Sequence, residues 1–169
     1  QLAEYIRGKY GTDNIAVVSP DSGRVRVAEK WADTLGGAPL AFIHKTRDVT
    51  RPNQSVANRV VGSVEGRTCL LVDDMIDSGG TICHAADALM NAGAASVVIA
   101  STHAIFSDPA VERLANSVAR EVIVTDTLPI TDEKKFDKLT VLSIAPLLSQ
   151  AIREVFEDGS VTSMFDEME

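Results

Sequence analysis

Hydrophobic and polar positions follow two different periods along the chain, and their alternation predicts strands separated by helices. Short apolar runs bounded by turn residues are typical of strands that are buried on both faces. Such runs occur at residues 15–18, 39–44, 69–72, 97–100, 122–124 and 141–142. Residues 56–64 have a mixed pattern, which indicates a strand at the edge of the sheet.

Helical spacing of apolar side chains appears between these runs. The spacing predicts amphipathic helices over residues 22–35, 82–90 and 144–156. Asp108 and Pro109 stand in the order that favours a helix start, with the aspartate as side-chain cap. Residues 45–55 and 73–80 are polar or glycine-rich, and we expect them to be loops.

Strands that alternate with helices are typical of βαβ units, whose parallel strands form a sheet covered on both faces. We therefore expect an α/β fold of three layers, with a mostly parallel central sheet and helices on both faces. A chain of 169 residues fits one domain, residues 1–169. Residues 1–12 read as the end of a helix already under way and residues 160–169 as a tail, so we expect a part of a longer protein.

The formal net charge of −8 limits the expected partners. A negative field disfavours general binding to nucleic acid or to acidic membranes. No apolar run approaches the roughly 18 residues needed to span a bilayer, and no signal-peptide pattern opens the chain. Cys69 and Cys83 lack metal or redox spacing, and we expect buried free thiols in a reducing, cytoplasmic compartment. An anionic substrate would therefore need a local basic loop, main-chain amides or a bound cation.

The segment LLVDDMIDSGGT, residues 70–81, has the features of an anion site. Gly79 and Gly80 lack side chains, so main-chain amides can approach an anion closely. The helix that follows adds unpaired N–H groups and the positive end of its dipole, which favour phosphate. Ser78 and Thr81 supply hydroxyl donors. The glycine-rich part of the segment follows the predicted strand at residues 69–72, and ligands bind at such strand ends in open α/β sheets.

Two carboxylates, Asp73 and Asp74, come directly after the buried part of this segment. They could accept hydrogen bonds from two neighbouring sugar hydroxyls or hold a metal ion through oxygen ligands. A simpler interpretation is a tight Gly79-Gly80 turn that the two acids cap. The complete pattern of strand, paired acids and glycine loop favours a receptor for a sugar phosphate.

The same segment matches the phosphoribosyl diphosphate-binding motif of type I phosphoribosyltransferases, in which apolar residues and two acids precede Ser/Thr-Gly-Gly-Thr. It lacks the Gly-Lys-Ser/Thr of common nucleotide hydrolases. The motif leaves the reaction open. Further segments resemble the C-terminal half of the ribose-phosphate diphosphokinase family, in the same order along the chain: residues 17–37, 41–54, 102–114, 121–130 and 141–165.

This resemblance implies a type I phosphoribosyltransferase-like fold and the synthesis of phosphoribosyl diphosphate. In that reaction the C1 hydroxyl of ribose 5-phosphate attacks the β-phosphorus of ATP, and AMP leaves. By resemblance, Asp73 and Asp74 engage the ribose hydroxyls. The residues implied to hold the 5-phosphate are Asp77, Ser78, Gly79, Gly80 and Thr81. The implied substrates are ATP and ribose 5-phosphate, the implied cofactor is Mg²⁺, and a homo-oligomer is expected because subunits of the family share the ATP site.

The Lys-x-Arg pattern of the family's catalytic loop falls on Lys45 and Arg47. Two cations on a loop that closes over substrates would stabilise the charge that develops on phosphoryl oxygens. Asp21 matches an acid that helps to bind magnesium in the family. The alternatives are that Lys45 and Arg47 only solvate an exposed loop and that Asp21 forms a turn, which is compatible with a metal role.

Three departures from the family and two rival functions stand beside this interpretation. Ala104 and Asp108 stand where many family members have glycine. Family members often have Asp-Ala-Gly-Gly at residues 21–24, so Arg24 places a bulky cation beside the expected metal site. The rivals are a nucleobase phosphoribosyltransferase, for which no base-binding segment is evident, and a non-catalytic synthetase-associated regulatory protein, which should have lost Lys45 or the loop acids. Because the family's adenine pocket lies in the N-terminal half, we expect the chain alone to bind ribose 5-phosphate without making product.

Overall fold

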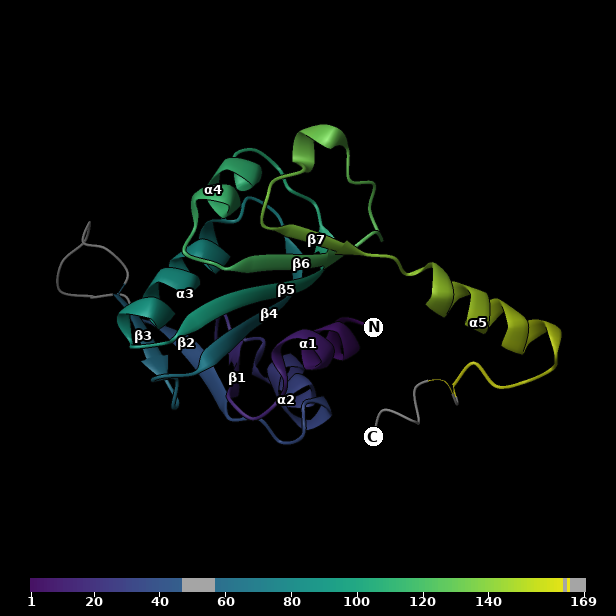
Figure 1. The fold of residues 1–169 in the computed structure, drawn as a ribbon, viewed down its shortest axis with the longest axis horizontal. Coiled ribbons are helices and arrows are strands. Elements are labelled where there is room, and N and C mark those ends of the chain that lie inside the picture. Colours follow the sequence, from purple (N-terminus) through teal and green to yellow (C-terminus); the bar gives the residue numbers. More distant parts are fainter. Residues whose placement is uncertain (47–56, 163, 165–169) are drawn as a thin grey trace.

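The computed structural model describes residues 1–46, 57–162 and 164. Within these residues, seven strands form one sheet in the order β3-β2-β1-β4-β5-β6-β7 (Figure 1). All neighbouring strands are parallel except β2 and β3, which are antiparallel. The strands are β1 (Ile15–Ser19), β2 (Leu40–Thr46), β3 (Ala57–Val61), β4 (Thr68–Ile76), β5 (Ser96–Ala104), β6 (Glu121–Thr125) and β7 (Leu139–Leu142). The predicted strands and the edge position of β3 are therefore confirmed.

Helices cover both faces of this sheet, as predicted (Figure 1). The α-helices are α1 (Leu2–Tyr10), α2 (Val25–Thr34), α3 (Gly80–Asn91), α4 (Ala110–Asn116) and α5 (Ala145–Phe156). Buried side chains of α1 and α2, such as Ile6 and Ala28, pack on one face. Those of α3 and α4, such as Leu89 and Leu114, pack on the other. Two apolar layers thus enclose the central strands, which are buried on both faces.

The path of the chain places one gap between helices at the middle of the sheet. From β1 the chain moves outward to β2 and β3, then returns to β4, which pairs with the other side of β1. From β4 it continues in the opposite direction through β5, β6 and β7. The connections after β1 and β4 therefore diverge, and such a switch point is where open α/β sheets bind ligands.

The predicted ends of two strands were wrong. β4 continues through Asp73 and Asp74 to Ile76, because β5 is long enough to pair with it as far as Ala104. The loop predicted over residues 73–80 is correspondingly shorter. β2 likewise extends through residues 45 and 46, which were predicted to be loop.

Two helix starts also differ from the prediction. α2 begins at Val25 instead of residue 22, because the carboxylate of Asp21 holds the following amides in a turn. α4 begins at Ala110, and Asp108 does not cap it. Pro109 itself occupies the N-cap position, and its ring carries no hydrogen-bond acceptor.

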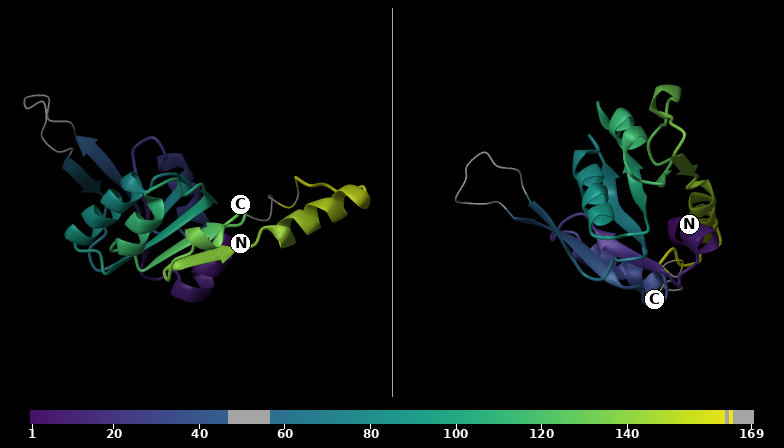
Figure 2. Two further views of the ribbon diagram at one scale, coloured as in Figure 1. Left: turned by 90° about the horizontal axis from the view of Figure 1, so that it is seen from above. Right: turned by 60° about the vertical axis from the view of Figure 1, so that its left-hand side comes forward.

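The predicted last helix forms, but it does not pack on the sheet. α5 extends away from the other elements (Figures 1 and 2), and none of its residues is buried. Val155 and Phe156 are 65% and 86% exposed. The apolar side chains of α5 are thus largely exposed to solvent. None of the described helices combines the length and the apolar character that crossing a membrane requires.

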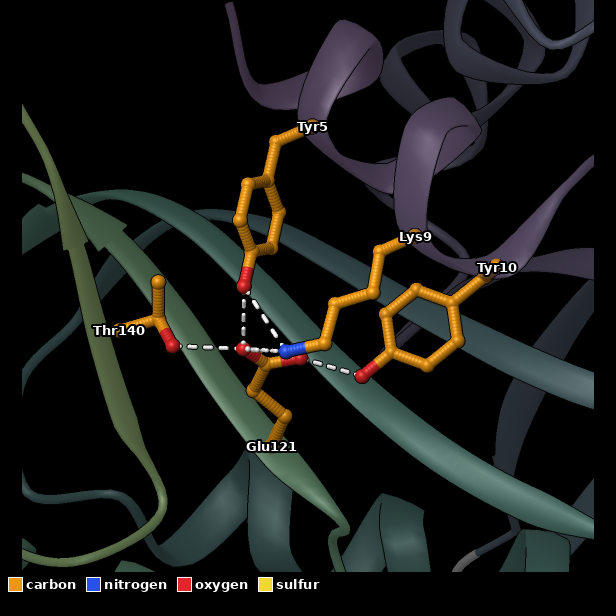
Figure 3. A network of polar contacts seen from close by, with 5 residues as sticks. All are labelled: Tyr5, Lys9, Tyr10, Glu121 and Thr140. Atoms are coloured by element: carbon orange, nitrogen blue, oxygen red, sulfur yellow. Dashed lines mark hydrogen bonds and ion pairs between the residues drawn. The ribbon is translucent and has the colours of Figure 1, made fainter.

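α1 is fastened to the sheet through one buried carboxylate, Glu121, at the first residue of β6 (Figure 3). Its Oε1 accepts hydrogen bonds from Tyr5 Oη and Lys9 Nζ, both at 2.8 Å, and from Thr140 Oγ1 at 2.5 Å. Tyr10 donates to the other oxygen. Burial acts to raise the pKa of Glu121, but these hydrogen bonds lower it to about 2. Glu121 is therefore a charged structural group, and both of its carboxylate oxygens accept hydrogen bonds.

Candidate functional site

A cavity of about 310 Å³ lies at the carboxyl ends of β1 and β4, at the switch point of the sheet. Asp21 and Arg24, which follow β1, form one wall, and residues 73–82 form the other. The structure thus brings together side chains that are distant in the sequence, since Arg24 and Asp74 are 50 positions apart and contact each other here. The sequence-predicted residues that line the cavity are Asp21, Asp73, Asp74, Asp77, Ser78, Gly79, Gly80 and Thr81.

The glycine loop, residues 77–81, comprises the connection that follows β4 and the first two residues of α3. Gly79 is the N-cap of α3 and has a φ of 73°, in the left-handed region that favours glycine. A Cβ at Gly79 would lie 3.5 Å from the Cα of Ala110, so α4 packs closely behind the loop. The first N–H groups of a helix have no acceptor within it and carry the positive end of its dipole. The loop therefore offers main-chain donors for an anion.

The neighbouring acids Asp73 and Asp74 differ in the direction of their pKa shifts. Burial raises the pKa of Asp73 to about 6. Burial also acts to raise the pKa of Asp74, but the hydrogen bond from Arg24 and further hydrogen bonds lower it overall. The main-chain amide of Asp74 donates to Oδ1 of Asp73 at 2.9 Å. Asp73 therefore takes up a proton at a higher pH than Asp74 does.

Arg24 forms an ion pair with Oδ2 of Asp74 across the cavity. The other oxygen, Oδ1 of Asp74, is buried and has no hydrogen-bond partner among the described residues. Both side chains remain more than a third exposed, at 41% and 36%, so a ligand can reach the pair. The bulky cation anticipated from the sequence is therefore present, and it contacts the acidic pair.

Asp21 forms the turn that its sequence context suggested. Its Oδ1 accepts hydrogen bonds from the amides of Gly23 at 2.8 Å and Arg24 at 3.1 Å. A carboxylate in this position leaves its second oxygen for another ligand. The turn interpretation is confirmed, and the magnesium role stays a prediction.

The carboxylate oxygens of the cavity are suitable ligands for a magnesium ion. Magnesium prefers oxygen ligands and is commonly bound through one or two carboxylates plus water and substrate phosphate. Asp74 offers a buried oxygen that has no partner within residues 1–46 and 57–162, and Asp21 lines the same cavity. Across residues 1–46 and 57–162 no group of three or more His, Cys, Asp or Glu could hold a metal by itself. An ion here would therefore rely on substrate oxygens as well.

The side chain of Lys45 and the whole of Arg47, the two predicted catalytic cations, lie outside the described part of the structure. Lys45 lies in β2, where its main chain pairs with Asn58 of β3. Arg47 lies outside the described residues. Their catalytic role stays a prediction from the family pattern.

One cation beside the glycine loop was not predicted from the sequence. Arg113, in α4, donates from Nη1 to the carbonyl oxygen of Ser78 at 3.0 Å. The two residues are 35 positions apart, and only the packing of α4 against α3 brings them together. No local sequence signal marks such a contact.

Comparison with known proteins gives the same picture from sequence. The family model described as phosphoribosyl synthetase-associated domain matches residues 48–166. The chain is 67% identical over 165 residues to a ribose-phosphate pyrophosphokinase of Mycobacterium tuberculosis (strain ATCC 25618 / H37Rv), covering 98% of this chain and 51% of that protein. It is 64% identical over 167 residues to the enzyme of Bifidobacterium longum, covering 98% and 49%. The chain thus spans about half the length of the curated relatives it matches.

Solved structures agree with these matches. A phosphoribosylpyrophosphate synthetase from Mycobacterium smegmatis superposes with a TM-score of 0.85 and 62% identity, covering 94% of this chain and 50% of that chain. An orotate phosphoribosyltransferase from Aeropyrum pernix superposes with a TM-score of 0.57 at 18% identity, covering 88% and 71%. The second likeness concerns the fold alone, and it confirms the expected type I phosphoribosyltransferase-like architecture.

Proposed function

Because the chain belongs to the phosphoribosyl synthetase-associated domain family and corresponds to the C-terminal half of ribose-phosphate pyrophosphokinases, we propose that it forms the ribose-phosphate site of such an enzyme. The observation that carries this proposal is the cavity at the switch point. There the N-terminal end of α3 and the carboxyl groups of Asp73 and Asp74 line one cavity of about 310 Å³. An anionic sugar needs both kinds of group, donors for its phosphate and acceptors for its hydroxyls.

The glycine loop holds the 5-phosphate. The amides at the start of α3 face an anion without the desolvation cost of a buried lysine, and the helix dipole adds to their attraction. Ser78 and Thr81 can donate from their hydroxyl groups. Asp77, which also lines the cavity, belongs to this group by its place in the family pattern. A local donor array of this kind compensates for the net charge of −8.

The acids hold the ribose ring. Ribose carries neighbouring hydroxyl groups that donate to carboxylates, and Asp73 and Asp74 supply acceptors at the cavity wall. The unpartnered Oδ1 of Asp74 is the acceptor most in need of a donor, because a buried oxygen without a hydrogen bond is destabilising. Sugar binding therefore gives a hydrogen-bond donor to an oxygen that the described part of the chain leaves without one.

Transfer of the diphosphate group requires charge stabilisation more than covalent chemistry. The C1 hydroxyl attacks the β-phosphorus of ATP and loses its proton to solvent, the bond from that phosphorus to the oxygen of the α-phosphate breaks, and AMP leaves. Lys45 and Arg47 are proposed to stabilise the negative charge on the transferring oxygens. A magnesium ion held by Asp21 and Asp74, when bound, would neutralise phosphate charge and orient the diphosphate. Arg24 forms an ion pair with Asp74, so part of that contact must break when the carboxylate binds the ion.

The remaining parts of the proposal follow from the family resemblance. They comprise ATP as the second substrate, a homo-oligomeric enzyme and a cytoplasmic location. The 169-residue chain corresponds to one half of the relatives. We therefore expect the isolated chain to bind ribose 5-phosphate without ATP-dependent synthesis of phosphoribosyl diphosphate.

Calorimetric titration of the purified chain with ribose 5-phosphate, with and without magnesium, tests the proposal. We expect saturable binding of one molecule per chain and far weaker binding of ribose, which lacks the phosphate. Asp137→Asn provides a control, since Asp137 is exposed and lies outside the cavity lining. Absence of measurable affinity for any pentose phosphate would contradict the proposed site.

A further inference from the structure

α4 contacts the side of the glycine loop that faces away from the cavity. The Nη1 atom of Arg113 donates to the carbonyl oxygen of Ser78 at 3.0 Å. A Cβ at Gly80 would lie 3.4 Å from the same Nη1, and a Cβ at Gly79 would lie 3.6 Å from the side chain of Leu114. The loop therefore rests on α4, with the guanidinium group of Arg113 at one carbonyl. Neither Arg113 nor α4 lines the cavity.

The planarity of the peptide bond links this carbonyl to the anion site. In a trans peptide unit the C=O and the following N–H point in opposite directions. The carbonyl of Ser78 and the amide of Gly79 belong to one such unit. When Arg113 holds the carbonyl on the α4 side, the amide of Gly79 points to the other side, where the cavity lies. Rotation of this unit would instead turn a carbonyl oxygen toward an incoming phosphate and repel it.

We propose that Arg113 is a positioning residue for anion binding, which fixes the Ser78–Gly79 peptide so that the Gly79 amide is presented to the ribose phosphate. This inference rests on the proposed function, because it names the phosphate of the sugar as the group that the amide receives. Gly79 needs such a restraint, since glycine has wide conformational freedom and its φ here is 73°. A preorganised donor avoids the cost of ordering the loop when the ligand arrives.

If Arg113 served only to pack α4 against the loop, Arg113→Ala would lower the thermal unfolding midpoint. The burial of the neighbouring residues argues against this role. α4 is already anchored by Ala110 and Leu114, both fully buried. The hydrogen bond of Arg113 lies at the surface of the molecule. Arg113→Ala should therefore leave the fold and the thermal unfolding midpoint nearly unchanged. An effect on phosphate binding without an effect on stability would distinguish positioning from packing.

The experiment measures the affinity of the whole 169-residue chain for ribose 5-phosphate and for inorganic phosphate by calorimetry. It also follows the Gly79 amide by ¹⁵N NMR. In Arg113→Ala we expect affinity for both anions to fall ~10-fold, the effect of losing one well-placed donor to a charged group. The Gly79 resonance should shift on anion addition in the wild type and much less in the variant. Arg113→Lys, which can still donate to the carbonyl, should recover most of the affinity.

Arg153→Ala is the matched control, because Arg153 is an exposed cation on α5. Its affinities should equal those of the wild type. Unchanged affinity in Arg113→Ala, or a Gly79 amide that still responds as in the wild type, would overturn the positioning role. Failure of the wild type to bind ribose 5-phosphate, with Arg113-dependent binding of inorganic phosphate, would overturn the proposed function and keep the positioning role. Binding of neither anion would overturn both.

Discussion

Glu121 and the Asp73–Asp74 pair are two acidic centres in one sheet that have opposite surroundings. Glu121 is 6% exposed and accepts hydrogen bonds from four side chains, and its pKa is lowered to about 2 (Figure 3). In the pair, burial raises the pKa of Asp73 to about 6, and Asp74 keeps one buried oxygen without a partner among the described residues. A carboxylate whose acceptors are all occupied stabilises the fold. One whose acceptors stay open is available to a ligand.

The positions of the two centres in the strands fit this difference. Glu121 is the first residue of β6, whereas Asp73 and Asp74 lie in the last part of β4. In a parallel sheet these positions lie at opposite ends of the strands, and ligands bind at the carboxyl ends. Residues at the amino ends can therefore make interactions that only hold α1 on the sheet. Loss of Glu121 should therefore reduce stability, and loss of Asp74 should reduce binding.

The largest expected effect is that of Glu121→Ala on stability. The substitution removes the acceptor of Lys9, two tyrosines and Thr140, and losing these hydrogen bonds to a charged group costs about 3 kcal/mol of the free energy of unfolding. Urea denaturation measures this loss. The exposed Glu133 supplies a control, since Glu133→Ala should change the free energy by less than about 0.5 kcal/mol. A variant as stable as the wild type would show that Glu121 does not fasten α1.

The pH dependence of stability should report the same group. The pKa of Glu121 is about 2 in the folded chain, below its usual 4.5, so the unfolded chain binds the proton more readily. Its contribution of about 3 kcal/mol is present above pH 4.5 and is lost as the pH falls toward 2. Stability between these values should depend more steeply on pH in the wild type than in Glu121→Gln. Equal slopes would contradict the assignment.

Asp74→Asn should affect binding and leave stability nearly unchanged. The substitution removes the charge that faces the ligand, and we expect the affinity for ribose 5-phosphate to fall ~10- to 100-fold. Arg24, its partner, is 41% exposed and can be solvated when the pair is lost. Calorimetry and urea denaturation of the same preparation measure both quantities. A loss of stability comparable to that of Glu121→Ala would make the two centres equivalent and remove the contrast.

The smallest effect is expected for Tyr10→Phe. The variant keeps the ring, which packs beside Arg120, and loses only the hydrogen bond to Glu121. One such bond to a charged group is worth about 1.5 kcal/mol. Thermal unfolding should shift by a few degrees, with the affinity for ribose 5-phosphate unchanged. A shift as large as that of Glu121→Ala would mean that the ring itself, and not the network, holds α1.

Much of the fold followed from the sequence because local patterns determine it. Apolar runs and helical spacing predicted the parallel sheet, its edge strand and the helices on both faces. The end of β4 was missed because Asp73 and Asp74 interrupt the apolar run, while pairing with β5 carries the strand on to Ile76. α5 was predicted as a helix, but its spacing does not reveal whether any element of this chain covers its apolar face.

The sequence predicted most of the residues that line the candidate cavity, but not the contacts that hold them in place. The cavity lining from Asp73 to Thr81 is contiguous in sequence, and its family pattern marks it directly. The pairing of Arg24 with Asp74 and the contact of Arg113 with Ser78 join distant elements. Such contacts depend on how α2 and α4 pack, which no local pattern specifies. The donors to Glu121, which come from α1 and β7, were missed for the same reason.

A crystal structure of the chain soaked with ribose 5-phosphate tests the central claim most directly. We predict that the phosphate lies against the main-chain amides of Gly79 and Gly80 at the start of α3, with ribose hydroxyls donating to Asp73 and Asp74. Glu121 should keep its four side-chain donors unchanged. A ligand seated elsewhere, or an empty cavity at a saturating concentration, would contradict the assignment of this cavity to a sugar phosphate.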